Sequence, residues 1–222
     1  SNPEEILLDE TNKKAYVTSP SASTIFVIDL NTMSLVQKIK INGYCEKLRL
    51  FDDKLIYVDK LKNEIWSIEL KNEYELKDIG QFPNVSDIVF ANNKLYLSSR
   101  TKSRIAVIDY STLGLVNEFT TVNKPLAMLL NDKTIYVLGA QNNIIQKISI
   151  ESDTPTGNIT IGTDGFSSGF HKVENTNYAV ITDLKSNKYS ILDLSKGKIL
   201  KTYSLNVPIK DVVITEKVEL FN

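Results

Sequence analysis

The sequence predicts an all-β fold, a β-propeller of four-stranded antiparallel blades, and three observations support this. A unit of 40 residues recurs along the chain, each unit contains four short apolar segments, and clusters of turn-forming residues separate these segments. Four antiparallel strands in a unit of this length are typical of a propeller blade.

The recurrence is clearest in the segment Ile25–Leu30. Its copies begin at Ile65, Ile105 and Ile145, each 40 residues after the last, and a fifth copy begins at Tyr189, four residues late. Three further columns keep the same step: Tyr16, Ile56, Tyr96 and Tyr136; Val17, Tyr57, Leu97 and Val137; Ile39, Ile79, Phe119 and Ile159. The agreement of four independent columns indicates a repeated structural unit.

The first unit shows the predicted strands of a blade. Apolar and β-branched runs predict strands over Glu5–Asp9, Ala15–Thr18, Thr24–Leu30 and Leu35–Ile41. Consecutive apolar residues in Ile25–Ile28 place side chains on both faces of the sheet, whereas a sheet covered on one face alternates strictly. Such a sheet must be covered on both sides, as blades stacked around an axis are. No segment has the pattern of a capped amphipathic helix.

The first unit also resembles a known family. Its order is Ala15-Tyr16-Val17-Thr18, a polar loop, Ile25–Asp29, Asn31-Thr32 and Leu35–Ile39, and this is similar to the YVTN-repeat β-propeller family. Ser19 stands where the family motif has Asn, and the family's Gly-x-x-Pro turn is kept only in part, at Gly43, Pro83, Pro125 and Pro208. The resemblance implies a propeller fold and leaves function open, because the motif residues are structural.

The repeat sets the expected organisation. We expect one propeller domain over 1–222, with complete units at about 3–43, 44–83, 84–123, 124–163 and 164–207 and half of a sixth at 208–222. Three alternatives stay open: part of a six- or seven-bladed ring, a ring completed by another chain, and a five-bladed ring with an extra hairpin. An open ring would expose strand edges and apolar sheet faces.

Composition excludes several classes of protein. The net charge is −1, from 26 basic and 27 acidic residues, which argues against a nucleic-acid partner. The single cysteine, Cys45, rules out an intramolecular disulfide, and no apolar run is long enough to span a bilayer. With the family resemblance, we expect a periplasmic, cell-surface or extracellular protein.

Polar residues in the first strand of each unit are the main candidates for a binding site. Aligned on the repeat, the column contains Leu7, Lys47, Asp87, Ala127, His171 and Asp211. The innermost strand borders the central channel, so Lys47, Asp87, His171 and Asp211 are predicted to line it. Alternatively, these groups pair with one another (Lys47 with Asp87, His171 with Asp211) and with ordered water.

The four-residue delay of the fifth unit lies in a glycine-rich loop, Gly162–Gly169. One hypothesis makes it a flap that carries Phe166 over one end of the channel, and the alternative is a tolerated surface insertion. The loops Asp59–Asn63, Arg100–Arg104 and Asp183–Ser186 form a basic rim that is suited to an acidic partner.

No catalytic constellation is evident. His171 is the only histidine, and neither Ser167 nor Ser168 lies in a nucleophile-elbow pattern. We therefore predict no catalytic residues, metal or cofactor, and a scaffold that binds a protein or glycan. Two alternatives are a propeller hydrolase or lactonase with a metal in the central channel, and a structural propeller domain of a larger assembly.

Overall fold

The computed structural model describes residues 3–206 except 52, 141–143, 162–166, 174 and 184, and it leaves the side chain of Glu46 undescribed. By its internal contacts the chain divides into two compact units, Ser1–Val85 and Ser86–Asn222. Within the described residues, the only helical element is a 3₁₀ turn at Pro20–Ala22, and no helix has the length and hydropathy needed to cross a bilayer.

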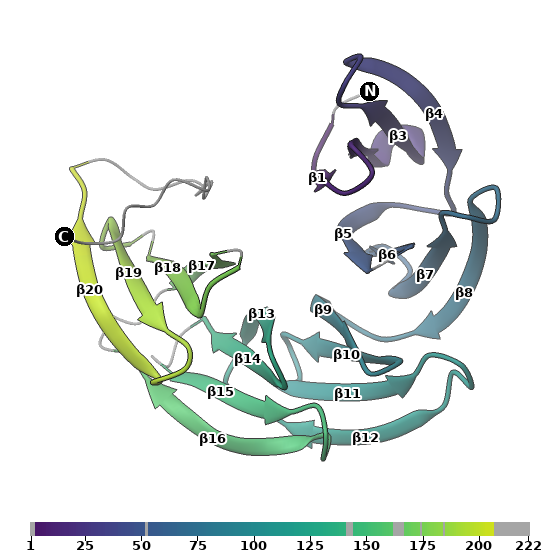
Figure 1. Ribbon diagram of the computed structural model, residues 1–222. Helices are drawn as coiled ribbons and strands as arrows, with labels where there is room; N and C mark the ends of the chain where they lie inside the picture. The colour runs from purple at the N-terminus through teal and green to yellow at the C-terminus, as the bar shows by residue number, and fades with distance from the viewer. Residues whose placement is uncertain are drawn as a thin grey trace. The chain divides into compact units, whose positions relative to one another are not determined.

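The first unit contains two four-stranded sheets (Figure 1). Blade 1 consists of β1 (Ile6–Asp9), β2 (Lys14–Ser19), β3 (Thr24–Asp29) and β4 (Ser34–Lys40). Blade 2 consists of β5 (Cys45–Phe51), β6 (Lys54–Asp59), β7 (Glu64–Glu69) and β8 (Glu75–Gln81). Each strand pairs antiparallel with the next, so each sheet follows the order of the sequence.

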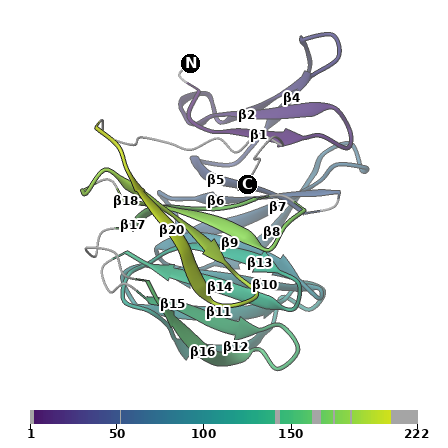
Figure 2. The ribbon, with the colours of Figure 1, turned by 60° about the vertical axis from the view of Figure 1, so that its left-hand side comes forward.

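The second unit contains three sheets of the same kind (Figure 2). Blade 3 consists of β9 (Val85–Ala91), β10 (Lys94–Ser99), β11 (Arg104–Asp109) and β12 (Leu115–Thr120). Blade 4 consists of β13 (Pro125–Asn131), β14 (Thr134–Gly139), β15 (Ile144–Ser149) and β16 (Thr154–Thr160). Blade 5 consists of β17 (Ser167–Lys172), β18 (Tyr178–Asp183), β19 (Lys188–Asp193) and β20 (Lys198–Ser204).

The prediction of an all-β fold made of four-stranded antiparallel blades is confirmed. The five complete repeats correspond to the five blades, and the strands of blade 1 lie within about two residues of their predicted bounds. The half unit predicted at 208–222 lies outside the described residues. The expectation of a single domain stays a prediction.

Each blade has two apolar faces, and the repeat columns alternate between them. We call the face that carries Tyr16, Ile25, Val27 and Ile39 in blade 1, and the equivalent residues elsewhere, the forward face. The opposite face, which carries Val17, Phe26, Ile28 and Leu35 in blade 1, is the rear face. Directly paired residues on neighbouring strands, such as Tyr16 and Val27, share a face.

Within each unit, the forward face of a blade packs against the rear face of the following blade. In the first unit, Tyr16, Ile25 and Val27 of blade 1 form one core with Leu48, Tyr57 and Ile68 of blade 2. In the second unit, the forward residues Tyr96, Ile105 and Val107 of blade 3 meet the rear residues Met128, Val137 and Ile148 of blade 4. Blade 4 in turn packs Tyr136, Ile145 and Ile159 against Phe170, Ile181 and Leu192 of blade 5. The periodic columns are therefore the contacts between blades.

Tyrosines of the forward face add hydrogen bonds at the outer side of these contacts. The Tyr136 hydroxyl donates to the Leu194 carbonyl of blade 5 over 2.9 Å. The Tyr96 hydroxyl donates to the carboxylate of Asp153 in blade 4, whose other oxygen lies 2.5 Å from the ammonium of Lys94. Burial raises the pKa of Tyr96 above its usual value, and the hydrogen bond to Asp153 raises it further, so the phenol stays protonated as a donor.

Carboxylates at the end of third strands hold the turns that follow. Asp109 Oδ1 accepts the amides of Ser111 and Thr112 over 2.9 and 2.8 Å, and Asp29 holds Asn31 and Thr32 in the same way. The backbone amide of Thr112 is the main cause of a lowered pKa at Asp109, because hydrogen-bond donors stabilise the charged form.

The blade core predicts different effects for two truncations in blade 3. Ile105 is fully buried, so Ile105→Ala leaves a cavity and should lower the free energy of unfolding by about 2–5 kcal/mol. Val116 is 48% exposed, so Val116→Ala should change it by less than about 0.5 kcal/mol. Chemical denaturation followed by circular dichroism measures both, and equal losses would contradict the packing scheme.

The Asp109 turn predicts a pH dependence. A carboxyl whose pKa is lower in the folded state stabilises the fold above its unfolded pKa of about 3.9, and this contribution disappears as the pH falls through the folded pKa. Asp109→Asn keeps an oxygen acceptor but removes the titration. Urea unfolding between pH 6 and 2 should show a smaller loss of stability below pH 4 for the variant. If the stability of both proteins falls equally with pH, the Asp109 carboxyl does not contribute to the loss of stability in acid.

Candidate functional site

The predicted channel column combines two different structural positions. Leu7 and His171 lie opposite Tyr16 and Val180, the residues of one repeat column in the second strand. Lys47 and Ala127 instead lie opposite Val58 and Leu138, two residues further along that strand. The turn from β1 to β2 contains four residues, whereas the turn from β5 to β6 contains two. Because of this difference, residues of β1 and β5 that are 40 apart in the sequence do not occupy the same position in their sheets. The second position holds one residue in each blade: Glu5, Lys47, Asp87, Ala127 and Gly169.

Two acids in this position connect one blade to the next. Glu5 accepts the backbone amide of Leu48 over 2.8 Å, and Asp87 accepts that of Met128 over 2.8 Å. Leu48 and Met128 are equivalent residues in the first strands of blades 2 and 4, opposite Tyr57 and Val137. The other oxygen of Asp87 accepts the Ile88 amide over 3.0 Å, and the side chain is buried. We call this contact the carboxylate clamp.

Sequence alignment missed Glu5 because it assumed equal turn lengths. Counting back from the end of the first strand places them together, because Glu5 lies four residues before Asp9 and Asp87 lies four residues before Ala91. Glu5 also forms an ion pair with Arg49 over 3.2 Å, and both side chains are about a quarter exposed. Glu5 therefore belongs to the contact between blades 1 and 2, as Asp87 belongs to the contact between blades 3 and 4.

Two further predicted channel residues lie among the described residues. Lys47 is half-buried in the first unit, and His171 is half-buried in the second. His171 lies over Gly169, where an added Cβ would come within 2.6 Å of its Nε2 atom, so glycine leaves room for the imidazole. Phe166 and Asp211 lie outside the described residues. The flap, the pairing of Lys47 with Asp87 and the pairing of His171 with Asp211 stay predictions.

The described residues offer few groups for chemistry. They contain no group of three or more His, Cys, Asp or Glu side chains placed to hold a metal ion. Ser168 Oγ lies 3.1 Å from both the carbonyl and the hydroxyl oxygen of Thr182. Cys45 is a buried thiol.

Two loops of blade 3 form a single basic surface. The β10–β11 loop and the β12–β13 loop are joined at Ser103, which accepts the Thr121 amide at its carbonyl over 2.9 Å and the Lys124 amide at its hydroxyl over 3.2 Å. Four exposed cations surround this joint: Arg100, Lys102, Arg104 and Lys124. Arg104 pairs with Glu118 over 2.9 Å. We call these loops and their four cations the basic loop pair.

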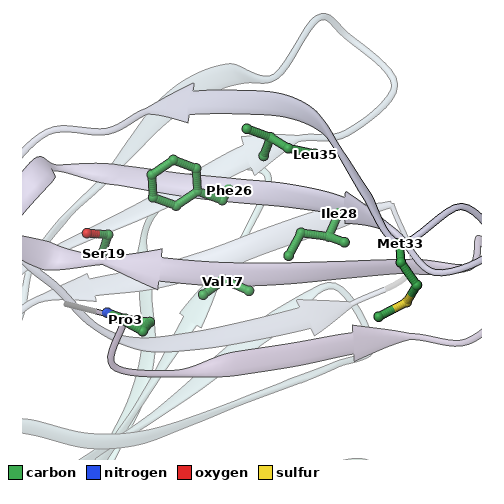
Figure 3. Close-up of a pocket in the computed structure, with 7 residues that line it drawn as sticks. All are labelled: Pro3, Val17, Ser19, Phe26, Ile28, Met33 and Leu35. Atoms are coloured by element: carbon green, nitrogen blue, oxygen red, sulfur yellow. The ribbon is translucent and has the colours of Figure 1, made fainter. Parts of the chain in front are cut away.

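An apolar pocket lies on the rear face of blade 1 (Figure 3). It has a volume of about 310 Å³. Its lining contains no charged side chain and consists of Pro3, Val17, Ser19, Phe26, Ile28, Met33 and Leu35. Met33 at its rim is 76% exposed, and Leu35 is 50% exposed.

Comparison with known proteins supports the fold. No family model matches the chain, and no curated protein matches its sequence. Virginiamycin B lyase from Staphylococcus aureus is similar in structure, with a TM-score of 0.75, 20% identity and coverage of 93% of this chain and 71% of the lyase. The computationally designed Ika8 protein has a TM-score of 0.72, 12% identity and coverage of 94% and 64%.

The dihydro-heme d1 dehydrogenase NirN is also similar, with a TM-score of 0.70, 16% identity and coverage of 91% of this chain and 48% of NirN. The chain thus spans about half to seven-tenths of the length of these structures. At such identities the likeness concerns the fold alone. Together with the five four-stranded blades, it defines the chain as a β-propeller protein.

The carboxylate clamp predicts a graded effect of substitutions at Asp87. Asp87→Ala leaves the buried amide of Met128 without its acceptor and should lower the free energy of unfolding by about 1–3 kcal/mol. Asp87→Asn keeps an oxygen acceptor and should lose less. Guanidinium denaturation of the three proteins measures the order, and an Asn variant as unstable as the Ala variant would show that charge matters more than the hydrogen bond.

Proposed function

We propose that this protein is a non-catalytic β-propeller that binds an anionic protein or glycan through the basic loop pair, at the cell envelope or outside the cell. The observation that carries the proposal is the joint at Ser103, which holds two loops and four cations together on one edge of blade 3. The resemblance to YVTN-repeat propellers, which we propose as the family, supports the location.

The charge of the basic loop pair is local. The whole chain has a net charge of −1, but neither Arg100–Arg104 nor Thr121–Lys124 contains an acid. Arg104 is paired with Glu118, so three cations remain in excess at this edge. Their attraction for an anion steers association, and a surface that is already ordered by hydrogen bonds loses little entropy on binding.

The alternatives have weaker support. A propeller hydrolase or lactonase would need ligands for a metal in its channel, and Asp87 already directs both oxygens at backbone amides. A lyase and a dehydrogenase are among the similar structures, but at 20% and 16% identity they lend no activity to this chain. A structural domain of a larger assembly would also have apolar surfaces such as the pocket of blade 1.

Charge reversal tests the proposal. With heparin and poly-glutamate as probes, the wild type should bind at least one of them at low salt, and binding should weaken as salt rises. The double variant Arg100→Glu, Lys102→Glu should bind about tenfold more weakly, a loss of about 1.4 kcal/mol. Biolayer interferometry at two salt concentrations measures this.

The matched control is Lys133→Glu, Lys198→Glu. It makes the same charge change in the same unit. Lys133 lies in the turn after the first strand of blade 4 and Lys198 begins the fourth strand of blade 5, so both lie at the other end of the antiparallel blades. This control should bind as the wild type does. No binding of either probe by the wild type, or an equal loss in the control, would refute the proposal.

A further inference from the structure

The short link that joins blade 1 to blade 2 contains a reactive pair of residues. Between β4 and β5 lies Asn42-Gly43, the only Asn-Gly pair in the sequence (Figure 1). Gly43 has a φ of 81°, a left-handed conformation that favours glycine, and a Cβ at this position would collide with the carboxylate of Asp59. The fold therefore requires glycine after Asn42.

The two groups that react with each other in an Asn-Gly pair are unrestrained here. The side chain of Asn42 is exposed, and among the described residues no hydrogen bond holds it or the Gly43 amide. The backbone of Asn42 is held instead, because its N–H donates to the Tyr57 hydroxyl over 3.2 Å and its carbonyl accepts that hydroxyl over 3.1 Å. Glycine also lacks a side chain that would shield its nitrogen, so this nitrogen and the Asn42 side-chain carbonyl are free to meet.

We propose that Asn42 is a self-modification site, at which the chain converts asparagine to aspartate and isoaspartate with water as the co-reactant. The Gly43 nitrogen attacks the side-chain carbonyl carbon of Asn42 and forms a new C–N bond. The bond to the side-chain nitrogen breaks, and ammonia leaves with the proton of the Gly43 amide. Water then opens the resulting succinimide at either carbonyl, which gives aspartate or isoaspartate. This chemistry is independent of anion binding by the basic loop pair.

Isoaspartate would alter the joint between blades 1 and 2. In this product the main chain runs through the former side-chain carbonyl and is longer by a methylene group. The Asn42 carbonyl that accepts the Tyr57 hydroxyl becomes a free carboxylate. Tyr57 is fully buried in the core that the two blades share, so a change in its hydrogen bonds reaches that core. The isoaspartate form should therefore be less stable than the aspartate form, which keeps the original main chain.

Incubation of the purified protein at mildly alkaline pH, which favours loss of the Gly43 amide proton, tests the proposal. In peptide mapping by mass spectrometry, the peptide with Asn42 should gain the mass difference between an acid and an amide, and enzymatic methylation of isoaspartate should label it. Asn72 and Asn123 are internal controls, because both are exposed but precede residues with long side chains. They should stay unmodified over the same time.

Asn42→Gln is the matched variant. It keeps a side-chain amide at an exposed position but must close a larger ring, so it should remain a single species on anion exchange. The wild type should instead divide into the unmodified protein and forms with an additional negative charge. The isoaspartate form, once separated, should melt at a lower temperature than Asn42→Asp, which has the same charge and an ordinary main chain.

Three outcomes would overturn the proposal. Reaction of Asn42 in urea but not in the folded protein would show that the fold restrains the pair. Reaction of Asn72 or Asn123 as fast as that of Asn42 would show that the glycine gives no selectivity. Equal melting temperatures of the isoaspartate form and Asn42→Asp would show that the joint between the blades does not depend on this link.

Discussion

A sheet with apolar side chains on both faces must be covered on both faces, and the rest of this structure depends on that constraint. Every blade has a forward face and a rear face, and each pair of consecutive blades within a unit buries one of each. The forty-residue repeat follows from this arrangement, because each unit must supply the same two surfaces. On the rear face of blade 1, apolar residues of this kind line an open pocket.

Apolar contact alone does not set how one blade aligns on the next. Hydrogen bonds, which are directional, set this alignment. At the inner strands, the carboxylates of Glu5 and Asp87 each accept one particular backbone amide of the following blade. On the outer side, Tyr96 and Tyr136 donate to groups of the following blade. Blades 3 and 4 have both kinds of bond, so they cannot slide or rotate against each other without breaking a buried hydrogen bond.

The fold could be predicted from the sequence, but the candidate functional site could be predicted only in part. Tyr16, Ile25 and Ile39 recur because they pack between blades, so periodicity revealed the strands and the core. The register of the first strands depends on turn length, and for this reason His171 and Asp87 were assigned to one column although they occupy two. The charges of Arg100 and Lys102 were visible in the sequence. Their connection to Lys124 through Ser103 was not, because it depends on tertiary hydrogen bonds.

The carboxylate clamp engages the main chain, and this has an evolutionary consequence. Leu48 and Met128 differ in side chain but present the same N–H group, which every amino acid except proline possesses. The residue that donates the amide therefore does not have to co-vary with the acid. Blades can therefore differ in sequence, exchange core residues and still dock.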